Sequence, residues 1–173
     1  GWLKAESDKQ LKVDRLGVWI AEDVSFNKDA KDIRKLRQTR LAFAQELNLS
    51  LIVTKEALAL KELLKGSDEA DEFTYIAARE YYGNKNYKLA LPLFDLLTLK
   101  TSESKLVTKW SILAQNLTLD IYNQAKDYPS IMKQVALWKG LEGQKIDKKY
   151  KTDFTNFDKI AIQAEFENAA KLG

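Results

Sequence analysis

The sequence YYGNKNYKLALPLF, at residues 81–94, decides how the chain is interpreted. Two aromatic residues and a glycine precede the polar segment Asn84–Asn86, and an apolar run that contains Pro92 follows it. Because Gly and Asn favour turns, this pattern predicts a turn at 84–86 between two helices. Pro92 lies too deep in the second helix for a first-turn position, so we expect a bend or a lost hydrogen bond there.

The composition favours a helical globular fold. The chain has 173 residues, of which 45% are hydrophobic and 31% are charged, and these fractions are typical of folded domains. Seven Gly and two Pro are too few for the many turns of an all-β protein, so we expect helices with short connections. No apolar run approaches the roughly 18–20 residues that span a bilayer, and we expect no integral membrane segment.

The missing residue types exclude several kinds of chemistry. The chain contains no Cys, which excludes disulfides, thiol catalysis and thiolate metal sites. It contains no His either, which removes the most frequent general base and metal ligand. No segment matches a calcium-binding helix–loop–helix. We therefore expect no enzyme activity, no cofactor and no metal site.

Hydrophobic periodicity and turn residues predict a succession of helices. In 8–24 a helix competes with a short strand at VWI, and in 29–65 two antiparallel helices that break near Asn48–Ser50 compete with one long helix. Further helices are expected at 68–82 and 87–99, from a cap at Thr101 or Ser102 to about 126, at 129–139, and at 153–172. Trp110 and Trp138 fit apolar stripes, which predicts that both lie in the core.

The residues around the opening stretch are spaced as in a known helical repeat. Counted from Asp71, small and aromatic residues fall at fixed positions on both sides of the turn: Ala78, Tyr81, Tyr87, Ala90 and Phe94. This pattern resembles a tetratricopeptide repeat. Ser102 stands where that family often has Pro, and Thr74 where it prefers Trp, so the repeat is degenerate.

A second copy of the same frame follows. Tyr122 and Tyr128 have the same separation as Tyr81 and Tyr87, and apolar residues follow at Ile131, Val135 and Trp138. Leu119 replaces the small residue, and the two copies are spaced further apart than the family period of about 34 residues. Residues 41–64 contain a still weaker copy, with Ala44, Leu47, Ala57 and Leu60.

The resemblance implies an all-α fold, a right-handed solenoid of antiparallel helical hairpins. We expect a single domain of residues 1–173. It comprises an N-terminal extension (1–27), a helical hairpin (28–66), two tetratricopeptide-like hairpins (67–140), and a loop with a capping helix (141–173).

The resemblance also implies a concave groove that is lined by the first helix of each repeat. The positions that face this groove in the family carry Glu72, Tyr75, Arg79 and Tyr82 in the first repeat and Asn116, Asp120 and Asn123 in the second. Arg, Asn and Tyr suit an extended peptide, because Asn pairs with peptide groups and Arg with carboxylates. The alternative is that both sets are ordinary solvated helix faces.

The expected function is a non-catalytic scaffold or adaptor that binds a protein or peptide in this groove. One alternative is an accessory helical domain of a larger enzyme of the cell envelope. Another is a basic module for nucleic acid or anionic membrane, based on Lys31, Arg34, Lys35 and Arg37. Interspersed Asp29 and Asp32 and a formal charge of +3 argue against nucleic acid, so we expect this segment to be a solvated helix face.

The ends and composition of the chain suggest its origin. The sequence begins at Gly1 rather than Met, so we expect a piece of a longer chain or a processed product. The absence of Cys is compatible with an extracytoplasmic location. The Lys- and Asn-rich composition favours a bacterial, envelope-associated protein.

Overall fold

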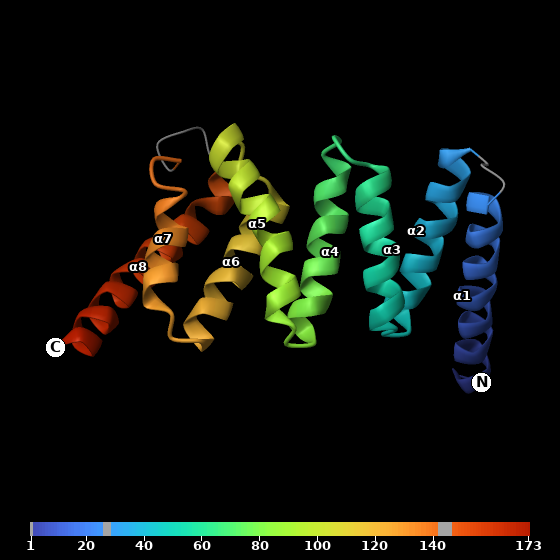
Figure 1. The fold of residues 1–173 in the computed structure, drawn as a ribbon, viewed down its shortest axis with the longest axis horizontal. Helices are drawn as coiled ribbons and strands as arrows, with labels where there is room; N and C mark the ends of the chain where they lie inside the picture. Colours follow the sequence, from blue (N-terminus) through green and yellow to red (C-terminus); the bar gives the residue numbers. More distant parts are fainter. Residues whose placement is uncertain (1, 26–28, 142–146) are drawn as a thin grey trace. The chain divides into compact units, whose positions relative to one another are not determined.

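The computed structural model describes residues 2–25, 29–141 and 147–173, and these residues are all-helical without a strand (Figure 1). The elements are α1 (Trp2–Ser25), α2 (Ala30–Glu46), α3 (Ser50–Leu63), α4 (Glu69–Gly83), α5 (Tyr87–Ser104), α6 (Lys109–Gln124), α7 (Tyr128–Ala136), the 3₁₀ helix η1 (Lys148–Tyr150) and α8 (Lys151–Leu172). The expected all-α class is confirmed, and the strand considered at VWI is wrong, because α1 is helical throughout. Residues 142–146, which belong to the predicted loop before the capping helix, lie outside the described residues.

The chain forms two compact units, residues 1–86 and 87–173. In the first unit, α2, α3 and α4 each pack against the preceding helix, and in the second unit α6, α7 and α8 do so. The division falls at the predicted turn, where Lys85 has a φ of 58°. Tyr81 and Tyr87 therefore belong to different units.

Local signals define the hairpin of α2 and α3. Asp29 precedes α2, and its carboxylate accepts a hydrogen bond from the backbone N–H of Lys31. Asn48 adopts a φ of 54° between the helices, a conformation that Asn tolerates better than most residues. The predicted break near Asn48–Ser50 is thus confirmed, and the single long helix is wrong. Gly66 follows α3 with a φ of 89°, as expected for a residue that stops a helix.

The predicted cap at Thr101 or Ser102 is wrong. Helix α5 continues through both residues to Ser104, and Thr101 is buried. Lys105 then takes a φ of 59°, and α6 begins after Thr108. The Thr108 hydroxyl accepts a hydrogen bond from the Ser111 N–H, and the Ser111 hydroxyl accepts one from the Thr108 N–H, which together form a capping box.

Prolines occupy two different helical positions. Pro129 lies in the first turn of α7, where the missing N–H costs nothing, and Asp127 caps that helix by accepting from Ser130 N–H. Pro92 lies inside α5, where it has no hydrogen to donate to the preceding turn. The lost hydrogen bond expected there is confirmed, and the bend stays a prediction.

An aromatic cluster forms the core of the second unit. Trp138 is buried, and the ring centroids of Phe154 and Phe157 lie 5.7 and 5.8 Å from its own. Its indole N–H donates to the Thr98 carbonyl at 3.0 Å, so the buried polar atom is satisfied. Trp138 is in the core as predicted, whereas Trp110 is only half-buried.

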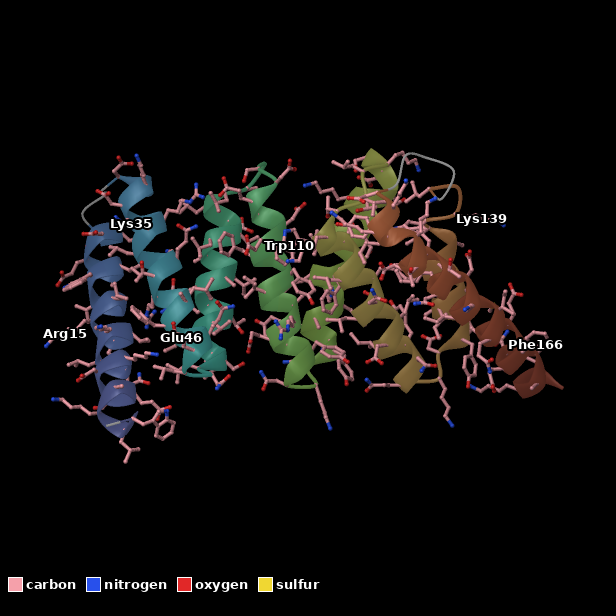
Figure 2. All side chains as sticks on the ribbon, turned by 180° about the vertical axis from the view of Figure 1, so that it is seen from behind. Arg15, Lys35, Glu46, Trp110, Lys139 and Phe166 are labelled. Carbon is pink, nitrogen blue, oxygen red and sulfur yellow. The ribbon has the colours of Figure 1, made fainter. Side chains whose placement is uncertain are left out.

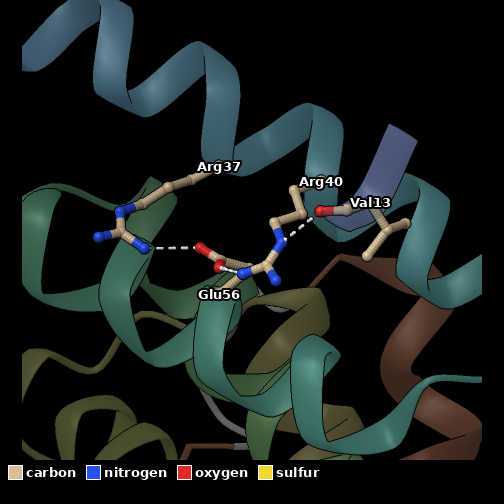
Figure 3. A network of polar contacts seen from close by, with 4 residues as sticks. All are labelled: Val13, Arg37, Arg40 and Glu56. Atoms are coloured by element: carbon tan, nitrogen blue, oxygen red, sulfur yellow. Dashed lines mark hydrogen bonds and ion pairs between the residues drawn. The ribbon is translucent and has the colours of Figure 1, made fainter. Parts of the chain in front are cut away.

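A buried carboxylate links the helices of the first unit (Figure 3). Glu56 of α3 is fully buried, and its two carboxylate oxygens accept from Arg37 at 2.6 Å and from Arg40 at 2.5 Å. Arg40 also donates to the Val13 carbonyl of α1 at 2.9 Å. Arg37 was expected on a solvated face, and that expectation is wrong because its guanidinium turns inward to a buried partner.

Candidate functional site

The second unit contains a groove of about 490 Å³ between α6 and α8, with α7 beneath it. It is lined by Asn116, Leu119, Asp120 and Asn123 of α6, by Tyr128 and Ile131 of α7, and by Lys159, Ile160, Gln163, Ala164 and Glu167 of α8. The three α6 residues predicted from sequence, Asn116, Asp120 and Asn123, are therefore brought together on one wall.

The helix geometry explains how the groove forms. Residues spaced by three and four positions share a helix face, so the polar residues of α6 make one continuous wall. Helix α7 is only nine residues long and follows its cap at Asp127. Its first turn, with Tyr128 and Ile131, lies beneath the groove. In Figure 1, α8 crosses α7 and runs away from the end of α6.

The floor of the groove is apolar. Leu119, Ile131 and Ala164 come from three different helices and are at most 2% exposed. Ile160 and Tyr128 are half-buried beside them and keep part of their apolar surface in contact with solvent. Ile160 and Tyr128 are therefore the apolar surface that can cover an apolar side chain of a ligand, since burial removes apolar surface from water.

The rim of the groove is polar. Asn116 donates to the Ile112 carbonyl at 3.1 Å and to the Asp153 carboxylate of α8 at 3.3 Å, which joins the two walls. Gln124 donates to Asp120, and Gln163 donates to Glu167 at 2.9 Å. Asn123 is exposed at the same rim. Carboxamides both donate and accept, so the rim offers partners to the N–H and C=O groups of a bound peptide.

The predicted residues of α4 belong to the first unit. Glu72 and Arg79 are exposed, Tyr82 is half-buried, and Tyr75 is buried with 8% of its surface exposed. Burial raises the pKa of the Tyr75 hydroxyl, and the nearby Arg79 guanidinium partly opposes this increase. The seven predicted residues thus fall into two sets, one in each unit, and their role in binding stays a prediction.

Arg79 lines a separate, polar cleft of about 430 Å³ within the first unit. Ser50 donates to the Glu80 carboxylate at 2.8 Å, and Asn84 donates to Ser50 at 2.6 Å. These bonds join the start of α3 to the end of α4, so Ser50, Glu80 and Asn84 of the cleft lining serve this connection.

Sequence reasoning missed the α8 wall. Lys159, Gln163 and Glu167 recur at every fourth position, but this helix was expected only to cap the stack. The spacing was a visible signal for one polar face. This face lies opposite α6 because of packing between residues that are distant in sequence. The spacing within α8 carries no information about that packing.

Helix α8 has a second groove on its other side. It measures about 410 Å³ and is bordered by Met132 and Val135 of α7 and by Asp158 and Ile162 of α8. Phe166 lies near the end of α8 and is 71% exposed (Figure 2). Apolar surface is therefore accessible on more than one face of this helix.

The basic segment of α2 is engaged by carboxylates. Arg34 pairs with Glu69 of α4, and Arg37 pairs with the buried Glu56. Lys31 and Lys35 are exposed. Two of the four cations are thus directed toward protein partners, which weakens the segment as a surface for phosphate.

Within the parts of the chain that the structure describes, no cluster of three or more acidic residues is arranged to hold a metal ion, and no helix combines the length and apolarity needed to cross a bilayer. In comparisons with known proteins, the chain matches no family model, no curated protein sequence and no solved structure.

Proposed function

We propose that this protein is a non-catalytic interaction module that binds a segment of a partner protein in the groove between α6 and α8. The observation that carries the proposal is an apolar floor, in which Ile160 and Tyr128 are accessible beside the buried Leu119, Ile131 and Ala164, together with a polar rim. The rim includes the carboxamides of Asn116, Asn123 and Gln163. Protein segments have both features: apolar side chains and regularly spaced peptide groups.

The proposed architecture is a tetratricopeptide-like stack. In that arrangement α6 and α8 are the first helices of successive hairpins, and α7 is the second helix of the hairpin that begins with α6. The groove lies between α6 and α8, where the resemblance places a binding surface. The packing of each helix against the one before it within each unit is compatible with such a stack.

The groove chemistry supports binding rather than catalysis. Its titratable side chains are Asp120, Tyr128, Lys159 and Glu167. A side chain is usually activated for catalysis when it is buried and when a general base lies within hydrogen-bond distance of it. Lys159 and Glu167 are exposed, so neither has the buried environment of an activated group.

A peptide-library selection tests the proposal. Random peptides are selected on the wild-type chain, and the enriched peptides are then measured by fluorescence polarisation against two variants. Asn123→Trp places an indole at the exposed rim of the groove, and Ser7→Trp places one on exposed α1 as the matched control. We expect binding to wild type and Ser7→Trp and loss of binding to Asn123→Trp. Equal binding to all three would show that the groove is not the site.

A further inference from the structure

The α8 wall of the groove carries one charge of each sign. Lys159 and Glu167 both line the groove and both are exposed. They are separated by about two helical turns, which corresponds to about 12 Å along the helix axis. Gln163 lies between them and is neutral. A ligand lying along this wall therefore meets a positive group at one end and a negative group at the other.

Neither charge is held in an ion pair within the described part of the chain, although the Asp120 carboxylate lines the same groove. Lys159 has no ion pair there, and Glu167 accepts a hydrogen bond at 2.9 Å from the uncharged amide of Gln163. An exposed ion pair gains little free energy, but it discriminates between ligands of different charge because like charges repel. The α8 wall can therefore discriminate between ligands by the order and sign of their charges.

We propose that the groove recognises a protein segment with an apolar centre and oppositely charged ends: an acidic residue that faces Lys159 and a basic residue that faces Glu167. This inference rests on the proposed function, because it specifies the partner of the same groove. An extended chain advances about 3.3 Å per residue, so the two charged residues of the ligand are about four positions apart. The apolar residue between them lies over Leu119, Ile131 and Ala164.

Three variants of the α8 wall, compared with wild type, test the charge pattern. Labelled peptides with one apolar centre carry mixed, doubly acidic or doubly basic ends, and their dissociation constants are measured by fluorescence polarisation at low ionic strength. Wild type is expected to bind the mixed peptide about two- to fivefold more tightly than either other peptide. Lys159→Glu should shift the preference to the doubly basic peptide, and Glu167→Lys to the doubly acidic peptide.

The double variant Lys159→Glu with Glu167→Lys is the decisive control. It has the same net charge as wild type, and it should prefer a mixed peptide in which the acidic and basic residues have exchanged places. The exposed positions predict little loss of thermal stability, and a melting curve for each variant checks this point. The preferences should also weaken as salt is added, since salt screens exposed charges.

The outcomes separate this inference from the proposed function. If the peptides bind wild type but not Asn123→Trp, and all charge patterns bind equally, the groove is the site and the charge selection is wrong. If the single variants do not change the preference, the charge selection is likewise wrong. If peptides from the library selection bind Asn123→Trp as well as wild type, the proposed function fails, and the inference fails with it.

Discussion

The guanidinium of Arg40 occupies the space in which a side chain at Gly17 would begin. A Cβ atom at position 17 would lie 2.6 Å from Nη2 of Arg40, well inside van der Waals contact. The guanidinium has little freedom to move, because it bonds both the Val13 carbonyl and the buried Glu56 carboxylate (Figure 3). The glycine in α1 thus makes room for a polar connection between α1, α2 and α3.

We expect Gly17→Ala to destabilise the protein despite the better helix propensity of alanine. Alanine gains about 1 kcal/mol in a helix interior, whereas a hydrogen bond to a charged group is worth about 1.5–3 kcal/mol. A net loss of about 1 kcal/mol in the free energy of unfolding follows, measured by urea denaturation. In an Arg40→Ala background the clash is absent, so the same substitution should become stabilising. If the effects of Gly17→Ala and Arg40→Ala on the free energy of unfolding simply add, the proposed clash between the two positions is wrong.

Glu56→Gln should be strongly destabilising. The substitution removes the buried negative charge and leaves the partly buried Arg37 and Arg40 without a counter-charge, and loss of one partner of a buried pair costs about 3–5 kcal/mol. The matched control is Glu62→Gln on the same helix, which is exposed and should change stability little. Similar melting temperatures for the two variants would show that the buried network contributes nothing specific.

Thr108→Ala should cost about 1 kcal/mol of unfolding free energy, because it removes the side chain that caps α6. Ser102→Ala, at the position where the sequence suggested a cap, lies inside α5 and should have a much smaller effect. Chemical denaturation of both variants measures the difference. A larger loss of unfolding free energy for Ser102→Ala than for Thr108→Ala would show that the helix is capped at Ser102 instead.

Asp95 should make the stability of the protein depend on pH in the acidic range. Burial raises the pKa of the Asp95 carboxyl, and the Lys133 ammonium opposes the increase only in part. A carboxyl with a raised pKa in the folded state stabilises the fold below its unfolded pKa of about 3.9 and loses that contribution as pH rises through the folded value.

Asp95→Asn should therefore raise the melting temperature at neutral pH, and the difference from wild type should shrink near pH 3. The substitution should also lower the raised pKa of Tyr122, which arises from burial and then from the charges of Asp95 and Asp127. A tyrosine titration by ultraviolet absorbance follows the second effect. A variant that is less stable than wild type at neutral pH would contradict this reading of Asp95.

The sequence predicted those features that depend on neighbouring residues. The break near Asn48–Ser50 and the helix that begins near Pro129 follow from local turn chemistry, and both occur in the structure. The cap at Thr108 was missed because Thr101 and Ser102 have the same chemistry a few residues earlier. Only the packing of α5, which buries Thr101, distinguishes these positions.

Features that depend on distant residues were not predictable in this way. Glu56 lies in a segment of strong helix formers and resembles an exposed residue in sequence, but two arginines of α2 surround it. In the groove, the α6 wall was predicted from the repeat pattern. The α8 wall was not, because it is placed by the crossing of α7 and α8, which involves Phe154 and Phe157 rather than the polar residues themselves.

The central claim is that a partner segment binds between α6 and α8, and amide chemical-shift mapping tests it most directly. A peptide from the library selection is titrated into ¹⁵N-labelled protein. The account predicts that the largest shifts belong to lining residues of both walls, including Asn116, Asn123, Gln163 and Glu167. Saturable shifts confined to α1–α4, or to the opposite face of α8, would contradict it.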